Sequence, residues 1–182
     1  GAGVGAINRI SVSVTASIGD GTSRSRVEAD GLTLLADDNS TIGVDAIGAS
    51  LAGAFAGKAA IAISVAASIA RNTISNAIEA SVVNTDLIVT GGDISITAKE
   101  RAGIDALSVA ASLAISAAGK IGGAISGAGA EATNVILTTT NAFIQDSAVG
   151  DDTMFGARNA TLRAEGTSKI RAIIVGVSAA VG

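Results

Sequence analysis

The sequence contains no cysteine, no histidine and no proline, and its aromatic residues are three phenylalanines. Without cysteine, the chain cannot be stabilised by disulfide bonds. Without histidine, it lacks the commonest metal ligand and general base, and a Ser–His or Cys–His catalytic pair is excluded. Proline removes a donor from a β-ladder, and ordinary usage of about 5% would give roughly nine in this chain. Its absence is typical of a chain in which nearly every backbone N–H is paired.

The distribution of charge excludes two further classes of protein. The formal net charge is −4, so the chain has no basic surface for nucleic acid. The long apolar stretch 46–70 is divided by Lys58 into two uncharged runs of 12 residues each. A membrane-spanning helix needs about 18 or more apolar residues, so the sequence predicts no membrane span.

Small and branched aliphatic residues dominate the chain. Hydrophobic residues make up 48% of the sequence but aromatic residues only 2%, so the apolar side chains are chiefly Ala, Ile and Val. A thick globular core usually relies on large side chains to fill its volume, whereas Ile, Val and Ala suit a narrow core stacked in layers. The length of 182 residues favours one domain.

The stretch 46–70 alternates with a period of two. Odd positions carry the larger side chains or glycine, and even positions are almost all Ala or Ser. This period predicts β-strands, because successive side chains of a strand point to opposite faces. We expect the odd-numbered face to fill a tight apolar interior and the small, flat, even-numbered face to lie against another surface. The large odd-numbered residues are Ile47, Leu51, Phe55, Ile61, Ile63, Val65 and Ile69.

A unit of about 62 residues occurs nearly three times. Asn8, Asn72 and Asn134 are each followed two positions later by isoleucine, at spacings of 64 and 62 residues. Later blocks also match, since LTLLA at 32–36 corresponds to ISITA at 94–98. Repeats of this length indicate a solenoid, in which each unit buries the edge of its neighbour. The approximate copies are 1–61, 62–124 and 125–182.

These patterns predict an all-β fold, a parallel β-solenoid built from about three copies of the repeat. We expect each copy to form two rungs of about 31 residues or three of about 20, with corners at 84–86, 91–93 and 99–101. Alanine is the best helix former, so Ala-rich runs such as 105–118 leave a helical alternative open. Strict alternation and the many β-branched residues favour strands.

Few residues are candidates for chemistry, and we predict no catalytic and no cofactor-binding residue. Two carboxylate pairs are weak candidates for a hard cation such as Ca²⁺, although neither lies in an EF-hand or a calcium-binding nonapeptide. Solvated turns are the alternative interpretation of these pairs, and the second pair falls in an insertion at 150–156 that we expect to form a loop. The four carboxylates are Asp37, Asp38, Asp151 and Asp152.

Asparagine recurs in register at Asn8, Asn72 and Asn134. In a solenoid, asparagines at equivalent positions stack, and each side-chain amide can bond to the next copy. We therefore predict a structural asparagine ladder at these three positions rather than a ligand site.

Three motifs resemble the repeats of giant bacterial surface and secreted proteins. They are AISVAASIARNTISNAIEASVV at 62–83, GGDISITA at 91–98 and SVAASLAIS at 108–116. The resemblance is to filamentous-haemagglutinin-like adhesins and leukotoxin-type large exoproteins. It implies a parallel β-helix stalk that is exported to the bacterial cell surface or beyond, usually for adhesion. It carries no catalytic residue over to this chain.

The leading hypothesis is therefore a structural or adhesive segment of an extracellular bacterial surface protein or of a self-assembling filament, without catalysis. Both ends of the chain look cut, so we expect it to be part of a longer protein or a unit of a polymer. The expected partners are further copies, bound end to end or laterally, and a host or neighbouring cell surface. The alternatives are a polysaccharide-cleaving β-helix enzyme and a membrane-inserting toxin segment.

Overall fold

The computed structural model describes residues 1–19, 21–150 and 156–182, and every regular element within these ranges is a β-strand. The long strands coincide with the alternating runs of the sequence, whose β-branched residues suit a pleated backbone. The strands are β1 (Ala2–Ile18), β2 (Ser25–Ala29), β3 (Leu32–Ala56), β4 (Ala59–Val83), β5 (Thr85–Val89), β6 (Ile94–Ala118), β7 (Ile121–Gln145), β8 (Ala148–Val149) and β9 (Ala160–Val181).

The strands form three parallel sheets, ordered β1-β4-β7, β2-β5-β8 and β3-β6-β9. We call these the first long sheet, the short sheet and the second long sheet, in that order. Each strand pairs with its counterpart in the next copy of the repeat, so that Asn8 lies beside Asn72 and Asn72 beside Asn134. The predicted all-β parallel solenoid of about three repeats is therefore confirmed.

Each repeat forms a single coil, so the prediction of two or three rungs per repeat is wrong. Ala59 of β4 lies beside Ile121 of β7, one full repeat of 62 residues (121 − 59) along the chain. The coil is long because β3, β4, β6 and β7 each run for 25 residues, about 80 Å at 3.3 Å per residue. The corner predicted at 99–101 is also wrong, because β6 continues through these residues.

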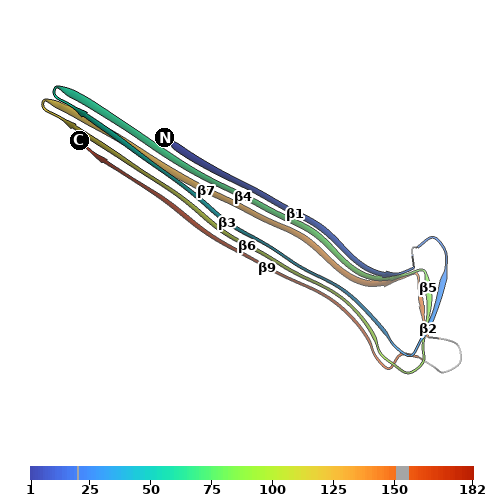
Figure 1. Cartoon of the computed structure of the whole chain (residues 1–182). Helices are drawn as coiled ribbons and strands as arrows, with labels where there is room; N and C mark the ends of the chain where they lie inside the picture. Colours follow the sequence, from blue (N-terminus) through green and yellow to red (C-terminus); the bar gives the residue numbers. More distant parts are fainter. Residues whose placement is uncertain (20, 151–155) are drawn as a thin grey trace.

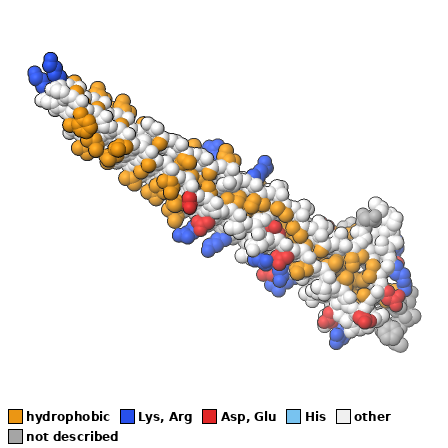
Figure 2. All heavy atoms as spheres, in the orientation of Figure 1, with side chains coloured by type: hydrophobic (Ala, Val, Ile, Leu, Met, Phe, Trp, Pro, Cys, Tyr) orange, Lys and Arg blue, Asp and Glu red, His pale blue; other side chains and the backbone are white. Residues whose placement is uncertain are grey.

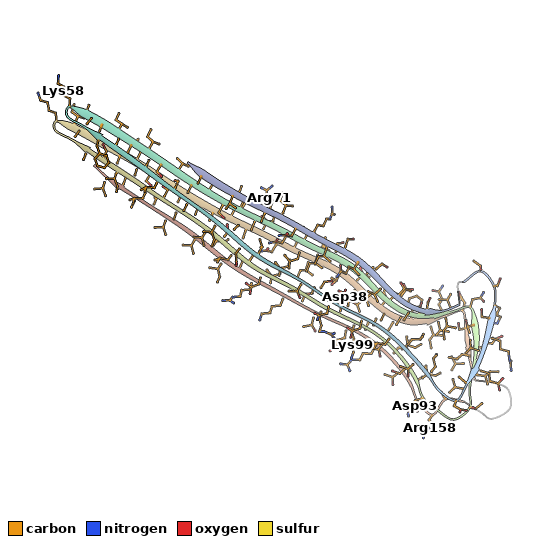
Figure 3. The ribbon with its side chains drawn as sticks, in the orientation of Figure 1. Asp38, Lys58, Arg71, Asp93, Lys99 and Arg158 are labelled. Carbon is orange, nitrogen blue, oxygen red and sulfur yellow. The ribbon has the colours of Figure 1, made fainter. Side chains whose placement is uncertain are left out.

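The molecule is long and narrow, with a wider head (Figure 1). The two long sheets run side by side from a tip to the head, where the short sheet connects them. Turns at 57–58 and 119–120 join the long sheets at the tip, and Lys58 lies at its extreme end (Figure 3). We define the distal arm as the part of both long sheets nearest the tip. It comprises residues 2–6, 46–70, 108–132 and 174–181, and its charged side chains are Lys58 and Lys120 at the tip and Glu131 at the opposite end of the arm.

Large aliphatic side chains fill the head, where the three sheets meet. Ile78 and Val82 of β4, Leu87 and Val89 of β5 and Ile96 of β6 are at most 1% exposed. A fully buried branched side chain of this kind stabilises the fold by about 1.5–3 kcal/mol relative to an exposed one. A second cluster extends the core towards the arm and consists of Ile42, Ile74, Ala102, Ile104 and Ala106.

The distal arm has the opposite arrangement to the one predicted. Its even-numbered Ala and Ser side chains lie between the two long sheets, and Ala66 and Ser68 are 1% and 0% exposed. Its large odd-numbered side chains face outwards, and Leu51, Phe55 and Ile61 are 72%, 77% and 71% exposed. The prediction that the odd-numbered residues fill the interior is therefore wrong for the arm. Alternation distinguishes two faces of a strand but does not say which face is inside.

The close approach of the two long sheets explains this arrangement. The Ser68 hydroxyl of β4 donates a hydrogen bond to the backbone carbonyl of Ala46 in β3 at 2.6 Å. A Cβ atom added to Gly48 of β3 would lie 2.6 Å from the backbone oxygen of Ala67 in β4. Sheets with large side chains pack about 10 Å apart, so an isoleucine or leucine does not fit between sheets whose backbones are this close.

Serine side chains bridge the two long sheets inside the arm. The hydroxyls of Ser50 and Ser64 lie 2.6 Å apart, and those of Ser68 and Ser108 lie 2.8 Å apart. These contacts give the buried hydroxyls partners, as buried polar groups require. Further bonds across the interior involve Ser112, Ser116 and Ser126.

The corners between the first long sheet and the short sheet use a left-handed backbone conformation. Asn84 and Asp146 occupy the same place in consecutive coils, and both have φ of 48°. Gly19, at the corner of the first coil, has φ of 78°. Asn, Asp and Gly are the residues that adopt this conformation most readily. The turn predicted at 84–86 is thus a corner at Asn84 alone, since β5 begins at Thr85.

Substitution of Gly48 by alanine tests the close approach of the sheets. Gly48→Ala places a methyl group against the backbone of β4 and is expected to lower the free energy of unfolding by about 1–3 kcal/mol. Gly43→Ala in the same strand is the control, because nothing lies within 4 Å of its added Cβ. Both variants lose the same glycine flexibility, so the difference in their urea midpoints reports the clash. Equal midpoints would show that the sheets are not in contact at Gly48.

Candidate functional site

The three asparagines predicted to form a ladder lie in register across the coils. The Asn8 side-chain amide donates to Oδ1 of Asn72 at 2.9 Å, and the Asn72 amide donates to Oδ1 of Asn134 at 2.8 Å. Asn72, in the middle coil, is 1% exposed. Because the Asn72 amide donates to one neighbouring coil and accepts from the other, the row fixes the coil register and offers little to a ligand.

The candidate cation ligands Asp37 and Asp38 point to opposite faces of β3. Asp37 lies on the outer face, where Arg101 of the next coil donates to it at 2.8 Å. Asp38 is buried and accepts hydrogen bonds from Ser40 and Asn76, the latter at 2.8 Å. The two carboxylates therefore do not form one site. Asp151 and Asp152 lie outside the described residues, within which no cluster of three metal-ligating side chains occurs.

A second buried carboxylate, Glu100, was missed by the sequence analysis. It is 1% exposed and lies beside Asp38 in the register of β3 and β6, whose strands are spaced about 4.8 Å apart. No hydrogen bond reaches either of its carboxylate oxygens from the described residues. Its place in the alternation is the feature of the sequence that indicates burial. Glu100 is even-numbered, like Ala98 and Ala102 on either side of it, whose side chains point inwards.

The environment of Glu100 favours its protonated form. Burial raises the pKa of the Glu100 carboxyl above its usual 4.5, and the neighbouring Asp38 carboxylate raises it further. The polar groups of Ser168, Thr138 and the Thr167 backbone lie near enough to the carboxylate to lower its pKa, although none is placed for a hydrogen bond of ordinary geometry, and they do not outweigh these effects. Protonation of Glu100 would relieve the repulsion of two buried like charges. Figure 3 shows Asp38 about midway along the molecule.

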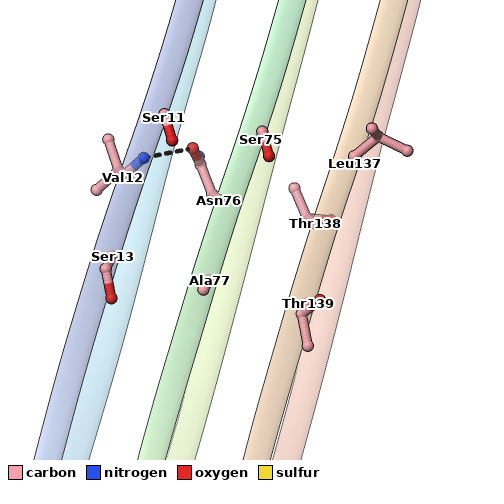
Figure 4. A pocket seen from close by; sticks show the side chains of 9 residues that line it. All are labelled: Ser11, Val12, Ser13, Ser75, Asn76, Ala77, Leu137, Thr138 and Thr139. Carbon is pink, nitrogen blue, oxygen red and sulfur yellow. Dashed lines mark hydrogen bonds between the residues drawn. The ribbon is translucent and has the colours of Figure 1, made fainter.

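A hollow of about 620 Å³ lies on the first long sheet and receives residues from all three coils (Figure 4). Small hydroxyl-bearing and aliphatic side chains line it, and its lining contains no charged group and no aromatic ring. The Asn76 side chain beneath it is held by the backbone N–H of Val12 at 3.1 Å. The hollow can therefore offer hydrogen bonds but no acid–base chemistry. Its outward side chains are Ser11, Ser13, Ser75, Ala77, Leu137 and Thr139.

The outer surface of the distal arm is unusual because many large apolar side chains are exposed on it. Large aliphatic side chains stand on both broad faces, and hydrophobic atoms follow the arm in Figure 2. The largest apolar patch of an ordinary monomer covers a few hundred Å² and often marks an interaction site. Alternation in the sequence places these residues on one face of the strands, and the structure shows that this face is the outer one.

Glu100→Gln tests the buried carboxyl pair. Because the folded-state pKa of Glu100 lies above the unfolded one, the native state binds more protons between the two values, and stability falls as the pH rises through this window. Glu100→Gln removes this dependence and is expected to raise the free energy of unfolding at pH 7 by about 1–3 kcal/mol.

Denaturant unfolding between pH 4 and pH 8 measures the effect, with Glu28→Gln as the control because Glu28 is exposed. A Glu100→Gln variant that is less stable than the wild type at pH 7 would show that the charged form is bound by a partner.

Comparison with known proteins identifies no relative. No family model, no curated protein and no solved structure matches this chain. None of the described residues forms a helix long and apolar enough to cross a membrane.

Proposed function

We propose that this chain is a structural and adhesive segment of an extracellular bacterial surface protein or of a self-assembling filament, and that its coils associate end to end. The observation that supports this most directly is the register of the coils. Long strands pair in parallel over their whole length, and an asparagine row and outward ion pairs such as Arg101–Asp37 cross from coil to coil. Such a ladder makes a stiff rod whose stability is a sum of neighbour contacts.

The two ends of the stack present long unpaired strand edges. Among the described residues, β1 and β3 have no partner on one side of the stack, and β7 and β9 have none on the other. Free N–H and C=O groups along an edge form a template for another strand. A further coil, from this chain or from a second copy, can continue the same parallel register at either end.

The direction of the free donors in β9 follows from the ladder. The Ile94 N–H of β6 donates to the carbonyl of Asn159, immediately before β9, at 2.8 Å. Alternate residues of a parallel strand direct their N–H and C=O groups to opposite neighbours. The backbone N–H and C=O groups of odd-numbered residues of β9 therefore point towards β6. Those of even-numbered residues such as Ala172 point towards the open edge.

Proline substitutions at neighbouring positions test end-to-end association. Ala172→Pro removes a free donor, so it is expected to leave stability nearly unchanged and to raise the protein concentration needed for association at least about tenfold. Ile173→Pro is the matched control, because it removes a hydrogen bond to β6 and should lower the free energy of unfolding by about 1–3 kcal/mol. Sedimentation velocity over a concentration series measures the first effect and denaturant unfolding the second. Association of Ala172→Pro at wild-type concentrations would contradict stacking through this edge.

A further inference from the structure

The outward side chains of the second long sheet form a continuous apolar surface along the distal arm. In the register of the sheet, Ile47 lies beside Val109 and Leu51 beside Leu113. All three coils contribute large residues, and several are more than half exposed. We call this surface the aliphatic face. It consists of Ile47, Leu51, Phe55, Val109, Leu113, Ile115, Val175, Val177 and Val181.

The opposite broad face of the arm is less suited to a large contact. On the first long sheet, the large outward side chains of the arm lie on β4 and β7, as in Ile61 and Ile121, and none lies on β1. Many of the corresponding positions on β1 and β7 are glycines, and a Cβ added to Gly5 or Gly127 would meet nothing within 4 Å. The aliphatic face thus carries large side chains on all three of its strands, and the opposite face on two.

The aliphatic face has a relief that complements itself. The row of Ala49, Ala111 and Val177 lies between the row of Ile47, Val109 and Val175 and the row of Leu51, Leu113 and Ala179. A shallow hollow of about 280 Å³ lies over Ala49 and Ala111, and Leu113 and Val177 also line it. Consider two copies that face each other with antiparallel strands, related by a twofold axis at the level of Ser112. Leu51 lies one residue beyond this level and Ala49 one residue before it. The Leu51 row of each copy therefore sits over the Ala49 row of the other.

The same register brings opposite charges together. Lys120 at the tip lies eight residues beyond Ser112, and the exposed Asp105 lies seven residues before it. An antiparallel pair therefore places Lys120 of one copy close to Asp105 of the other. Lys120 forms no ion pair within the described residues, and Asp105 is approached by Arg171 at 3.7 Å.

The area is sufficient for a specific contact. The arm presents 11 residues each of β3 and β6 and eight of β9, up to about 36 Å of strand, over a width of about 14 Å for three strands at 4.8 Å. Two copies would together bury about 1,000 Å², which is the lower limit for specific protein interfaces. Each additional coil widens the aliphatic face by one strand, or about 4.8 Å.

We propose that the aliphatic face binds the same face of a second copy of this chain, with antiparallel strands and a twofold axis along the direction in which the coils stack. Because the axis is parallel to the stack, coil faces coil, and both solenoids can extend in the same direction. This pairing rests on the proposed role as a self-associating structural segment, but it uses a different surface from end-to-end stacking.

Lysine substitutions on the two broad faces test the pairing. Leu51→Lys puts a charge on the aliphatic face and is expected to raise the dissociation constant of the lateral dimer at least about tenfold. Ile61→Lys is the matched control, because Leu51 and Ile61 are 72% and 71% exposed and only the face differs. Circular dichroism checks that both variants keep their strands.

Both variants are made in the wild-type chain and in the Ala172→Pro chain, and sedimentation equilibrium gives the dissociation constants. Dimers of Ala172→Pro that Leu51→Lys disrupts and Ile61→Lys does not would support the lateral pairing even if end-to-end stacking fails. Equal dimerisation of the two lysine variants would overturn it. A Leu51→Lys variant that dimerises normally but no longer binds vesicles of anionic phospholipid would assign the face to a membrane surface instead.

A charge exchange tests the antiparallel register independently. Lys120→Asp is expected to weaken the lateral dimer severalfold, because it brings two carboxylates together. The double variant Lys120→Asp with Asp105→Lys restores the opposite charges and should recover most of the wild-type affinity. If the double variant is as weak as Lys120→Asp alone, the antiparallel register is wrong.

Discussion

The contact between the two long sheets determines most features of this molecule. Ser68 reaches the backbone of Ala46, and Gly48 lies against the backbone of Ala67, so alanine, serine and glycine fill the space between the sheets. Large aliphatic side chains are then placed in the two environments that have room for them. In the head, the short sheet separates the long sheets and isoleucine, leucine and valine form a core. In the distal arm, they stand on the outer surface.

This division has an energetic consequence for the arm. Burial of an alanine removes far less apolar area from water than burial of an isoleucine, and the hydrophobic effect scales with that area. The arm is therefore held mainly by its backbone ladder and by interior hydrogen bonds such as that between Ser68 and Ser108. Its large apolar residues contribute little while they face water. Association of arms through the aliphatic face would supply the burial that a single copy lacks.

The sequence predicted the strands, the parallel solenoid and the register of Asn8, Asn72 and Asn134, because period-two alternation and a fixed repeat length depend only on order along the chain. It did not predict which face of the arm is inside, since alternation is symmetrical and the decisive fact is the distance between two sheets. It also placed a corner at Glu100, because three consecutive charged residues usually mark a solvated turn. The alternation places Glu100 on the inward face, but only the pairing of β3 with β6 puts a second carboxylate, Asp38, beside it.

Stacking along the solenoid and pairing across the arm would reinforce each other. A coil added at an edge extends the aliphatic face by one strand, so lateral contact area grows in proportion to the number of stacked coils. Two copies already paired side by side hold their open edges level, which raises the effective concentration of the next coil at both edges. Because the twofold axis is parallel to the direction in which coils stack, lateral pairing leaves the strand edges open and end-to-end stacking leaves the aliphatic face open. An assembly with these properties grows as a paired filament rather than as a closed oligomer, since no rotation brings its two ends together.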